Sequence, residues 1–154
     1  MRDGFKPISD YGVIGNTRTV ALIDREGAIG WFCSPNFDSP PAFYPILDTH
    51  YGGYCRIEAP GLKAGSRHYI ENTAALETIL ECRNGSLQVT DFMPVLQDGF
   101  AGPRTGLVQI ARIITCIEGR VPVKARICPA RGFVHRHRGK LPRLDELRSR
   151  YELH

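Results

Sequence analysis

The chain has 154 residues, five cysteines and a formal net charge of +4. This length fits one domain, and domains of this size bury roughly two-thirds of the surface that their unfolded chains expose. No run of about 18 apolar residues is present and the N-terminus has neither a signal nor a transit pattern, so we expect a cytoplasmic protein without membrane contact.

The charge is uneven along the chain. Residues 1–129 contain 13 basic and 13 acidic side chains, whereas residues 130–154 contain seven basic and three acidic ones. We therefore predict a globular domain over residues 1–130 and a basic tail over residues 131–154 that is irregular or contains a short helix. The tail has no nucleic-acid-binding motif, so we expect no nucleic-acid partner.

The first predicted hairpin lies in VALIDREGAIGWF, residues 20–32. Asp24 and Gly27 bound its turn, because glycine readily takes the left-handed conformation that turns need. The loop SPNFDSPP then leads into one short helix near residues 40–47. Ser39 would cap that helix, Pro40 would lie in its first turn, and apolar side chains would share one of its faces.

The next segments predict further strands. GGYCRIEAP, residues 52–60, is a short strand between turn residues. LETILECRNGSLQVTDFM is a hairpin with Asn84–Gly85 as a type I′ turn. That turn places Cys82 opposite Leu87 and Thr78 opposite Asp91, and it makes one face of the hairpin mostly apolar.

LVQIARIITCIEGRVPVKARIC, residues 107–128, predicts a third hairpin that turns at Glu118–Gly119. Short strands separated by turn signals at intervals of about ten residues are typical of a sandwich or barrel. The predicted fold class is therefore all-β, an antiparallel β-sandwich.

Residues with catalytic or ligand chemistry are scattered. The five cysteines form no C-x-x-C pair and are expected to be small buried apolar residues. His50 and His68 have no second ligand at metal spacing, and His135 with His137 fits a solvated tail. Asp91 lies among apolar neighbours, which favours a hydrogen-bonded structural role over a catalytic one. We assign no catalytic residue, metal site or cofactor.

Four aromatic residues allow three interpretations. They can belong to the core, form a stacking platform for a sugar, or dock on another domain. These residues are Trp31, Phe32, Phe37 and Phe43.

Three ordered segments within residues 8–130 resemble a known family. They are ISDYGVIGNTRTVALIDREGAIGWFCSPNFDSPPAFYPILD, GGYCRIEAP and RHYIENTAALETILECRNGSLQVTDFMP. They are similar to the N-terminal, trehalase-like domain of the family 15 glycoside hydrolases, which include glucoamylases, glucodextranases and trehalases. The resemblance implies a many-stranded super-sandwich followed in sequence by a helical (α/α)6 catalytic barrel. It makes that barrel the implied partner and an α-glucan or trehalose the implied substrate.

The resemblance also implies that this chain is not catalytic by itself. An inverting glycosidase needs two carboxyl groups about 6.5–9.5 Å apart, and in this family both are glutamates of the barrel. The implied role is to pack on the barrel and shape the rim of its active site. The rim or docking candidates are Arg18, Trp31, Phe37, Asp38 and Ser39.

Turn chemistry is the alternative for three of these candidates. In that interpretation Asp38 or Ser39 caps the short helix and Arg18 pairs with a nearby carboxylate. Two other functions also stay open for the whole chain. It can be a free-standing carbohydrate-binding module or a protein-interaction domain that uses an uncovered apolar patch.

The sequence departs from the family pattern after Ala130, where relatives continue into an aromatic, Asp-containing strand. We hypothesise that RGFVHRHRGKLPR reflects a truncated or frame-shifted reading of a longer gene. Sequencing the transcript across the codons for Cys128 to Phe133 tests this: a tail unchanged in independent transcripts counts against it.

Overall fold

The computed structural model describes residues 5–95 and 108–130. These residues form an all-β fold with antiparallel pairing, as predicted, preceded by one 3-10 turn at Ile8–Asp10. One sheet contains, in spatial order, β1 (Gly12–Gly15), β2 (Val20–Ile23), β3 (Ile29–Cys33) and β4 (Pro41–Phe43). A two-stranded sheet pairs β5 (Tyr54–Glu58) with β10 (Lys124–Cys128). The third sheet contains β6 (Lys63–Tyr69), β7 (Leu76–Cys82), β8 (Gly85–Phe92) and β9 (Ala111–Gly119).

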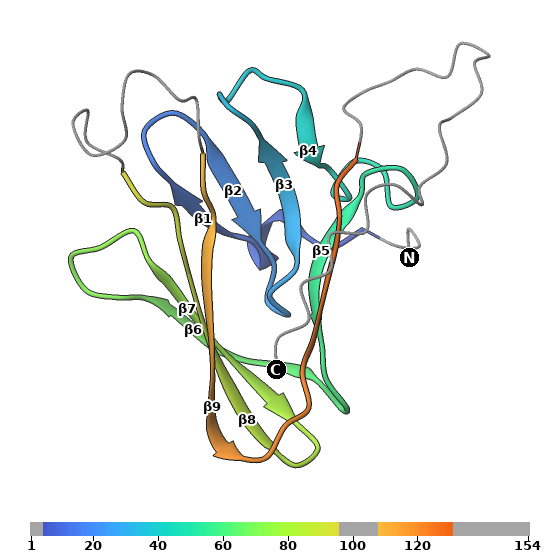
Figure 1. The fold of residues 1–154 in the computed structure, drawn as a ribbon, viewed down its shortest axis with the longest axis vertical. Helices are drawn as coiled ribbons and strands as arrows, with labels where there is room; N and C mark the ends of the chain where they lie inside the picture. The colour runs from blue at the N-terminus through green and yellow to red at the C-terminus, as the bar shows by residue number, and fades with distance from the viewer. Residues whose placement is uncertain (1–4, 96–107, 131–154) are drawn as a thin grey trace.

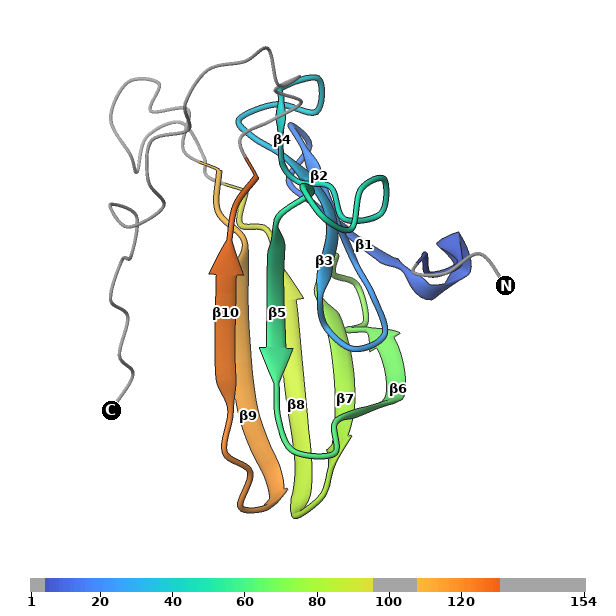
Figure 2. The same cartoon turned by 90° about the vertical axis from the view of Figure 1, so that its right-hand side faces the viewer.

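The three sheets build a two-layered sandwich (Figures 1 and 2). The β6–β9 sheet is one layer, and the β5–β10 pair and the β1–β4 sheet lie against it. Ile57 of β5 packs on Leu80, Leu87 and Val89. The β1–β4 sheet instead packs on the ends of β7 and β8, through a second cluster that includes Leu76. Two apolar clusters therefore hold the layers together.

The β2–β3 hairpin has the predicted turn. Gly27 has a φ of +79°, and its N–H donates to the carbonyl oxygen of Asp24 at 3.1 Å. The Asp24 carboxylate accepts from the N–H groups of Glu26 and Ala28 at 2.9 and 2.8 Å. A buried carboxylate thus replaces water as the partner of the turn's backbone donors.

The prediction of a short helix near residues 40–47 is wrong. Pro41–Phe43 form β4, in which Phe43 lies opposite Phe32 of β3. Only a turn follows, where the N–H groups of Leu47 and Asp48 both donate to the carbonyl oxygen of Tyr44. Burying Phe43 against the neighbouring strand outweighs the local capping signal, because propensity is weak beside tertiary packing.

The β7–β8 hairpin forms, but its register differs from the prediction by two residues. Leu80 lies opposite Leu87, and Thr78 lies opposite Val89. Because a shift of two residues keeps each side chain on its face, the predicted apolar face is still the buried one. Its eight residues are Leu76, Thr78, Leu80, Cys82, Leu87, Val89, Asp91 and Met93.

The cause of the shift is a close contact with a third strand. Gly85 lies opposite Gly119 of β9, and a Cβ atom added at Gly85 would lie against the Glu118 carbonyl oxygen. Gly85 is therefore required as a strand residue, and Arg83 with Asn84 forms the two-residue loop. An Asn-Gly pair read in isolation cannot reveal that requirement.

The prediction of a third hairpin over residues 107–128 is also wrong. β9 pairs with β8, whereas β10 crosses to the opposite layer and pairs with β5 (Figure 2). Pro122 lies in the crossing segment, and it has no N–H to donate to a neighbouring strand. The sequence reasoning also missed β6, whose mostly polar residues hide a strand that pairs with β7.

Two further expectations concern the cysteines and the tail. Cys33 is buried as expected. Cys55, Cys82 and Cys128 are only half-buried and Cys116 is exposed, so the expectation of burial is wrong for Cys116 and met only in part for the other three. The predicted basic tail, including His135 and His137, lies outside the described residues.

Candidate functional site

The loop of residues 34–40 connects β3 to β4 and contains three of the predicted site residues. The Ser39 hydroxyl accepts from the Asn36 N–H at 3.0 Å, and the Ser39 N–H donates to the Asn36 carbonyl oxygen at 3.0 Å. Ser39 therefore closes a tight turn. The turn chemistry predicted for Ser39 is present, but no helix follows it.

The β1–β2 loop holds this turn in place. The Phe37 N–H donates to the Arg18 carbonyl oxygen at 3.0 Å, and the Arg18 guanidinium donates to Asn36 Oδ1 at 3.2 Å. The expectation that Arg18 pairs with a carboxylate is wrong, because an amide oxygen takes that place. Asn16 Oδ1 in turn accepts from the Arg18 and Thr19 N–H groups. The structure thus brings Arg18, Phe37 and Ser39 together on two adjoining loops.

The aromatic residues fall into two groups. Phe32 and Phe43 are buried and stack with their ring centroids 6.4 Å apart, so these two belong to the core. Phe37 is 65% exposed, and the adjacent Asp38 is exposed as well. Trp31 is half-buried on the opposite face of β3 from Phe32. Phe37 is therefore the aromatic candidate most available to another molecule.

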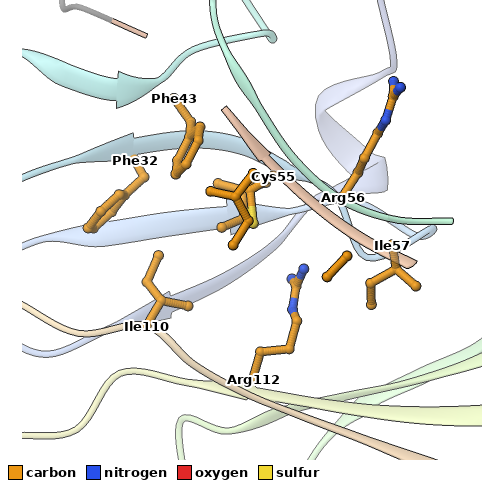
Figure 3. A pocket seen from close by; sticks show the side chains of 10 residues that line it. Phe32, Phe43, Cys55, Arg56, Ile57, Ile110 and Arg112 are labelled. Atoms are coloured by element: carbon orange, nitrogen blue, oxygen red, sulfur yellow. The ribbon is translucent and has the colours of Figure 1, made fainter. Parts of the chain in front are cut away.

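A hollow of about 260 Å³ lies between the two layers, next to the first residues of β9 and to β10. Figure 3 shows Phe32, Phe43 and Ile110 around it, with the Arg112 side chain reaching into it from β9. Ile127 of β10 also lines it and stays 66% exposed. The sequence reasoning did not find this hollow, because its walls combine β3, β4 and β5 with β9 and β10, which lie more than 50 residues further along the chain.

Asp91 and Arg112 form a paired charge beside the hollow. Arg112 Nε and Nη2 donate to the two Asp91 carboxylate oxygens at 2.6 and 3.1 Å. The Asp91 side chain is completely buried, and the Arg112 side chain is 15% exposed. Burial raises the pKa of the Asp91 carboxyl above its ordinary value, and the Arg112 guanidinium partly offsets that rise. The predicted structural, hydrogen-bonded role of Asp91 is confirmed, and its partner Arg112 is the residue that sequence reasoning missed.

The residues that line the hollow include few groups that could act as a general acid or base. None of its ten lining residues is a carboxylate or a histidine. Its one thiol, Cys55, has a pKa raised by burial, which keeps the thiol protonated at neutral pH. The walls are otherwise apolar apart from two arginines, and Arg56 uses its guanidinium to bind Glu58 at 3.0 Å. This arrangement suits packing better than proton transfer.

Among the residues that the structure describes, no group of three His, Cys, Asp or Glu side chains is placed to hold a metal ion. His68 lies 3.4 Å from a Glu77 oxygen, which sequence spacing did not indicate. The described ranges contain no helix long and apolar enough to cross a membrane.

These features define an all-β sandwich domain with an ordered surface loop. The chain belongs to the trehalase-like N-terminal domain family, whose family model matches residues 3–143. That match extends past Ala130 into the basic tail.

Three curated relatives are trehalases. The chain is 32% identical to trehalase 2 of Sulfolobus acidocaldarius over 120 residues, which cover 78% of this chain and 18% of that protein. It is 36% identical to the trehalase of Mycolicibacterium smegmatis over 59% of this chain and 14% of that protein, and 40% identical to the trehalase of Thermoplasma volcanium over 60% and 15%. The matched part of this chain thus spans less than a fifth of each relative. No solved structure matches it.

Proposed function

We propose that this chain is the accessory N-terminal domain of a trehalose or α-glucan hydrolase, and that it packs on a separate catalytic barrel. The observation that carries the proposal is the family match over residues 3–143, combined with relatives that are trehalases several times longer. The family 15 assignment, the (α/α)6 architecture of the barrel and a cytoplasmic location are parts of this proposal. Five free thiols fit a reducing compartment.

The loop of residues 34–40 is the part of the domain that we assign to the barrel's rim. An aromatic side chain exposed at 65% is a typical anchor for another surface, and the loop holds Phe37 without help from a partner. Arg18 holds this loop at two points: its carbonyl oxygen accepts from the Phe37 N–H, and its guanidinium donates to the Asn36 side chain. A loop ordered before binding loses less entropy when it docks, so it is well suited to shape a pocket.

A chimera tests the proposal. The N-terminal region of the Mycolicibacterium smegmatis trehalase is replaced by residues 1–130 of this chain, and a second version simply lacks that region. We expect the chimera to hydrolyse trehalose faster than the deleted version, because the barrel regains its packing surface. Equal activity of the two versions would overturn the proposal.

Two substitutions in the chimera test the loop. Phe37→Ala is expected to lower kcat/KM about tenfold, which corresponds to about 1.4 kcal/mol, the scale of an interface anchor. Ile8→Ala is the matched control, since Ile8 is an apolar side chain exposed at 80% and lies outside the loop. Equal effects of the two substitutions would show that the loop does not contribute to the rim of the active site. The proposed accessory role of the domain would be unaffected.

A further inference from the structure

The hollow between the two layers leaves inward-facing apolar surface uncovered. Ile127 of β10 lies directly opposite Cys55 of β5, and both residues line the hollow. Side chains on the inner face of a sandwich pack against the other layer, yet Ile127 is 66% exposed. The inner face of β10 therefore has room for a further apolar group.

The hollow can be reached from one side of the molecule without moving a strand. In the described part of the chain, β9 is the last strand of its sheet and β10 pairs only with β5. Figure 2 shows β9 and β10 along the same side of the sandwich, in different layers. A segment that approaches from this side thus meets the hollow between two outer strands.

Arg112 narrows the chemistry of such a segment. Its side chain reaches into the hollow and donates to Asp91 through Nε and Nη2, whereas Nη1 makes no hydrogen bond to a described residue. A guanidinium has five N–H donors, so donors remain for an oxygen acceptor. Asp91 already balances the charge. The hollow therefore suits apolar side chains together with an uncharged acceptor such as a backbone carbonyl.

The described fold ends beside this hollow. The Ala130 N–H donates to the Ala42 carbonyl oxygen at 2.7 Å, and the next residue, Phe43, lines the hollow. The family is an N-terminal domain, and the matched part is only 18% of trehalase 2 of Sulfolobus acidocaldarius, so most of such an enzyme follows β10. That region starts close to the hollow, and a tethered segment has a higher effective concentration there than a separate molecule.

We propose that the catalytic region of a longer enzyme inserts an apolar segment into this hollow, between β9 and β10, and that a backbone carbonyl of the segment accepts from Arg112 Nη1. This inference rests on the proposed function and adds a second contact to the loop of residues 34–40. The two contacts differ in direction. The loop presents the exposed Phe37 ring to the catalytic region, whereas the hollow receives apolar side chains from it.

Two native thiols report whether the hollow is filled. Cys55 lines it, whereas Cys116 is exposed and does not line it. The 154-residue chain and the active chimera described above are treated with N-ethylmaleimide, and peptide mass spectrometry gives the rate at each thiol. We expect Cys55 to react at least about tenfold more slowly in the chimera, because the inserted segment excludes the reagent. Cys116 should react at the same rate in both proteins.

Matched serine substitutions locate the contact. Ile127→Ser should bring the Cys55 rate in the chimera close to the rate in the 154-residue chain with the same substitution, because it removes apolar surface that the segment covers. Ile113→Ser is the control: Ile113 is 54% exposed on β9 and does not line the hollow, so the tenfold difference should remain. Both sites are exposed, so both variants should fold, which circular dichroism checks.

Equal Cys55 rates in the two proteins would overturn the inference. The proposed function would still stand if that chimera hydrolyses trehalose faster than the version that lacks the N-terminal region. Slow Cys55 labelling without a gain in activity would support the contact and count against the proposed function. A Cys55 rate that is already as slow in the 154-residue chain, or that falls as its concentration rises, would also overturn the inference, because the chain itself or a second copy would then fill the hollow.

Discussion

The two sides of this sandwich differ in how completely they are built. Under the β1–β4 sheet, Ile14 and Ile23 are fully buried in a continuous apolar cluster. On the other side only β5 and β10 face the β6–β9 sheet, and the hollow of about 260 Å³ leaves Ile127 largely exposed. Both sides contain a buried apolar cluster, but the hollow makes the open side the place where an additional surface can pack.

The charged pair between the layers gives the largest predicted effect. Arg112→Met removes the partner of a fully buried carboxylate, and we expect a loss of about 3–5 kcal/mol in the free energy of unfolding at pH 7. Urea denaturation followed by circular dichroism measures it. A loss below about 1 kcal/mol would show that water reaches Asp91 through the hollow and that the open side is wetter than the structure implies.

The same variant has a characteristic pH dependence. Because burial raises the pKa of Asp91 in the folded state, the folded protein binds more protons than the unfolded chain between the ordinary and the raised pKa. Stability from this group is therefore present at low pH and lost as the pH rises through the raised value. Without Arg112 the pKa should rise further, so Arg112→Met should regain stability as the pH falls through that raised pKa toward the ordinary value of a carboxyl. The double variant Asp91→Asn/Arg112→Met should show no such gain.

A pair of truncations compares the two sides directly. Ile23→Ala on the closed side should cost about 2–5 kcal/mol, because it leaves a cavity in a filled cluster. Ile127→Ala on the open side should cost less than about 0.5 kcal/mol, since most of that side chain already contacts water. Thermal denaturation of both variants gives the two values. Equal losses would mean that the open side is packed as well as the closed side.

A modest loss of stability is predicted for a variant of the cap on β1. Tyr69→Phe removes a hydroxyl that makes two hydrogen bonds to Val13 and should cost about 1 kcal/mol. It should also speed amide exchange at Val13, which hydrogen exchange measures by mass spectrometry. Unchanged exchange at Val13 would show that the hydroxyl does not protect this edge.

Short-range patterns predicted the fold class and part of its detail. The Gly27 turn and the buried face of β7 and β8 followed from residues within each hairpin. The β7–β8 register did not, because Gly85 is needed against Gly119 of a third strand. The pairing of β10 with β5 joins residues about 70 positions apart, and nothing in the local sequence encodes it.

In the candidate site, too, local features could be predicted from the sequence and contacts between distant segments could not. The Ser39 turn was predictable from a hydroxyl near a proline-rich loop, whereas the Arg18 contact with Asn36 depends on two loops that only the fold brings together. Asp91 could be recognised as a structural carboxylate from its apolar neighbours. Its partner Arg112 could not, because the pairing of β8 with β9 lies outside any local pattern.

We propose that this chain supports a glycoside hydrolase and does not itself transfer the protons that hydrolysis needs. Glucose release from trehalose, maltose and dextran by the purified 154-residue chain tests it most directly. We expect release equal to the buffer blank at every protein concentration. Release that rises in proportion to the chain and disappears in Asp38→Asn would contradict it.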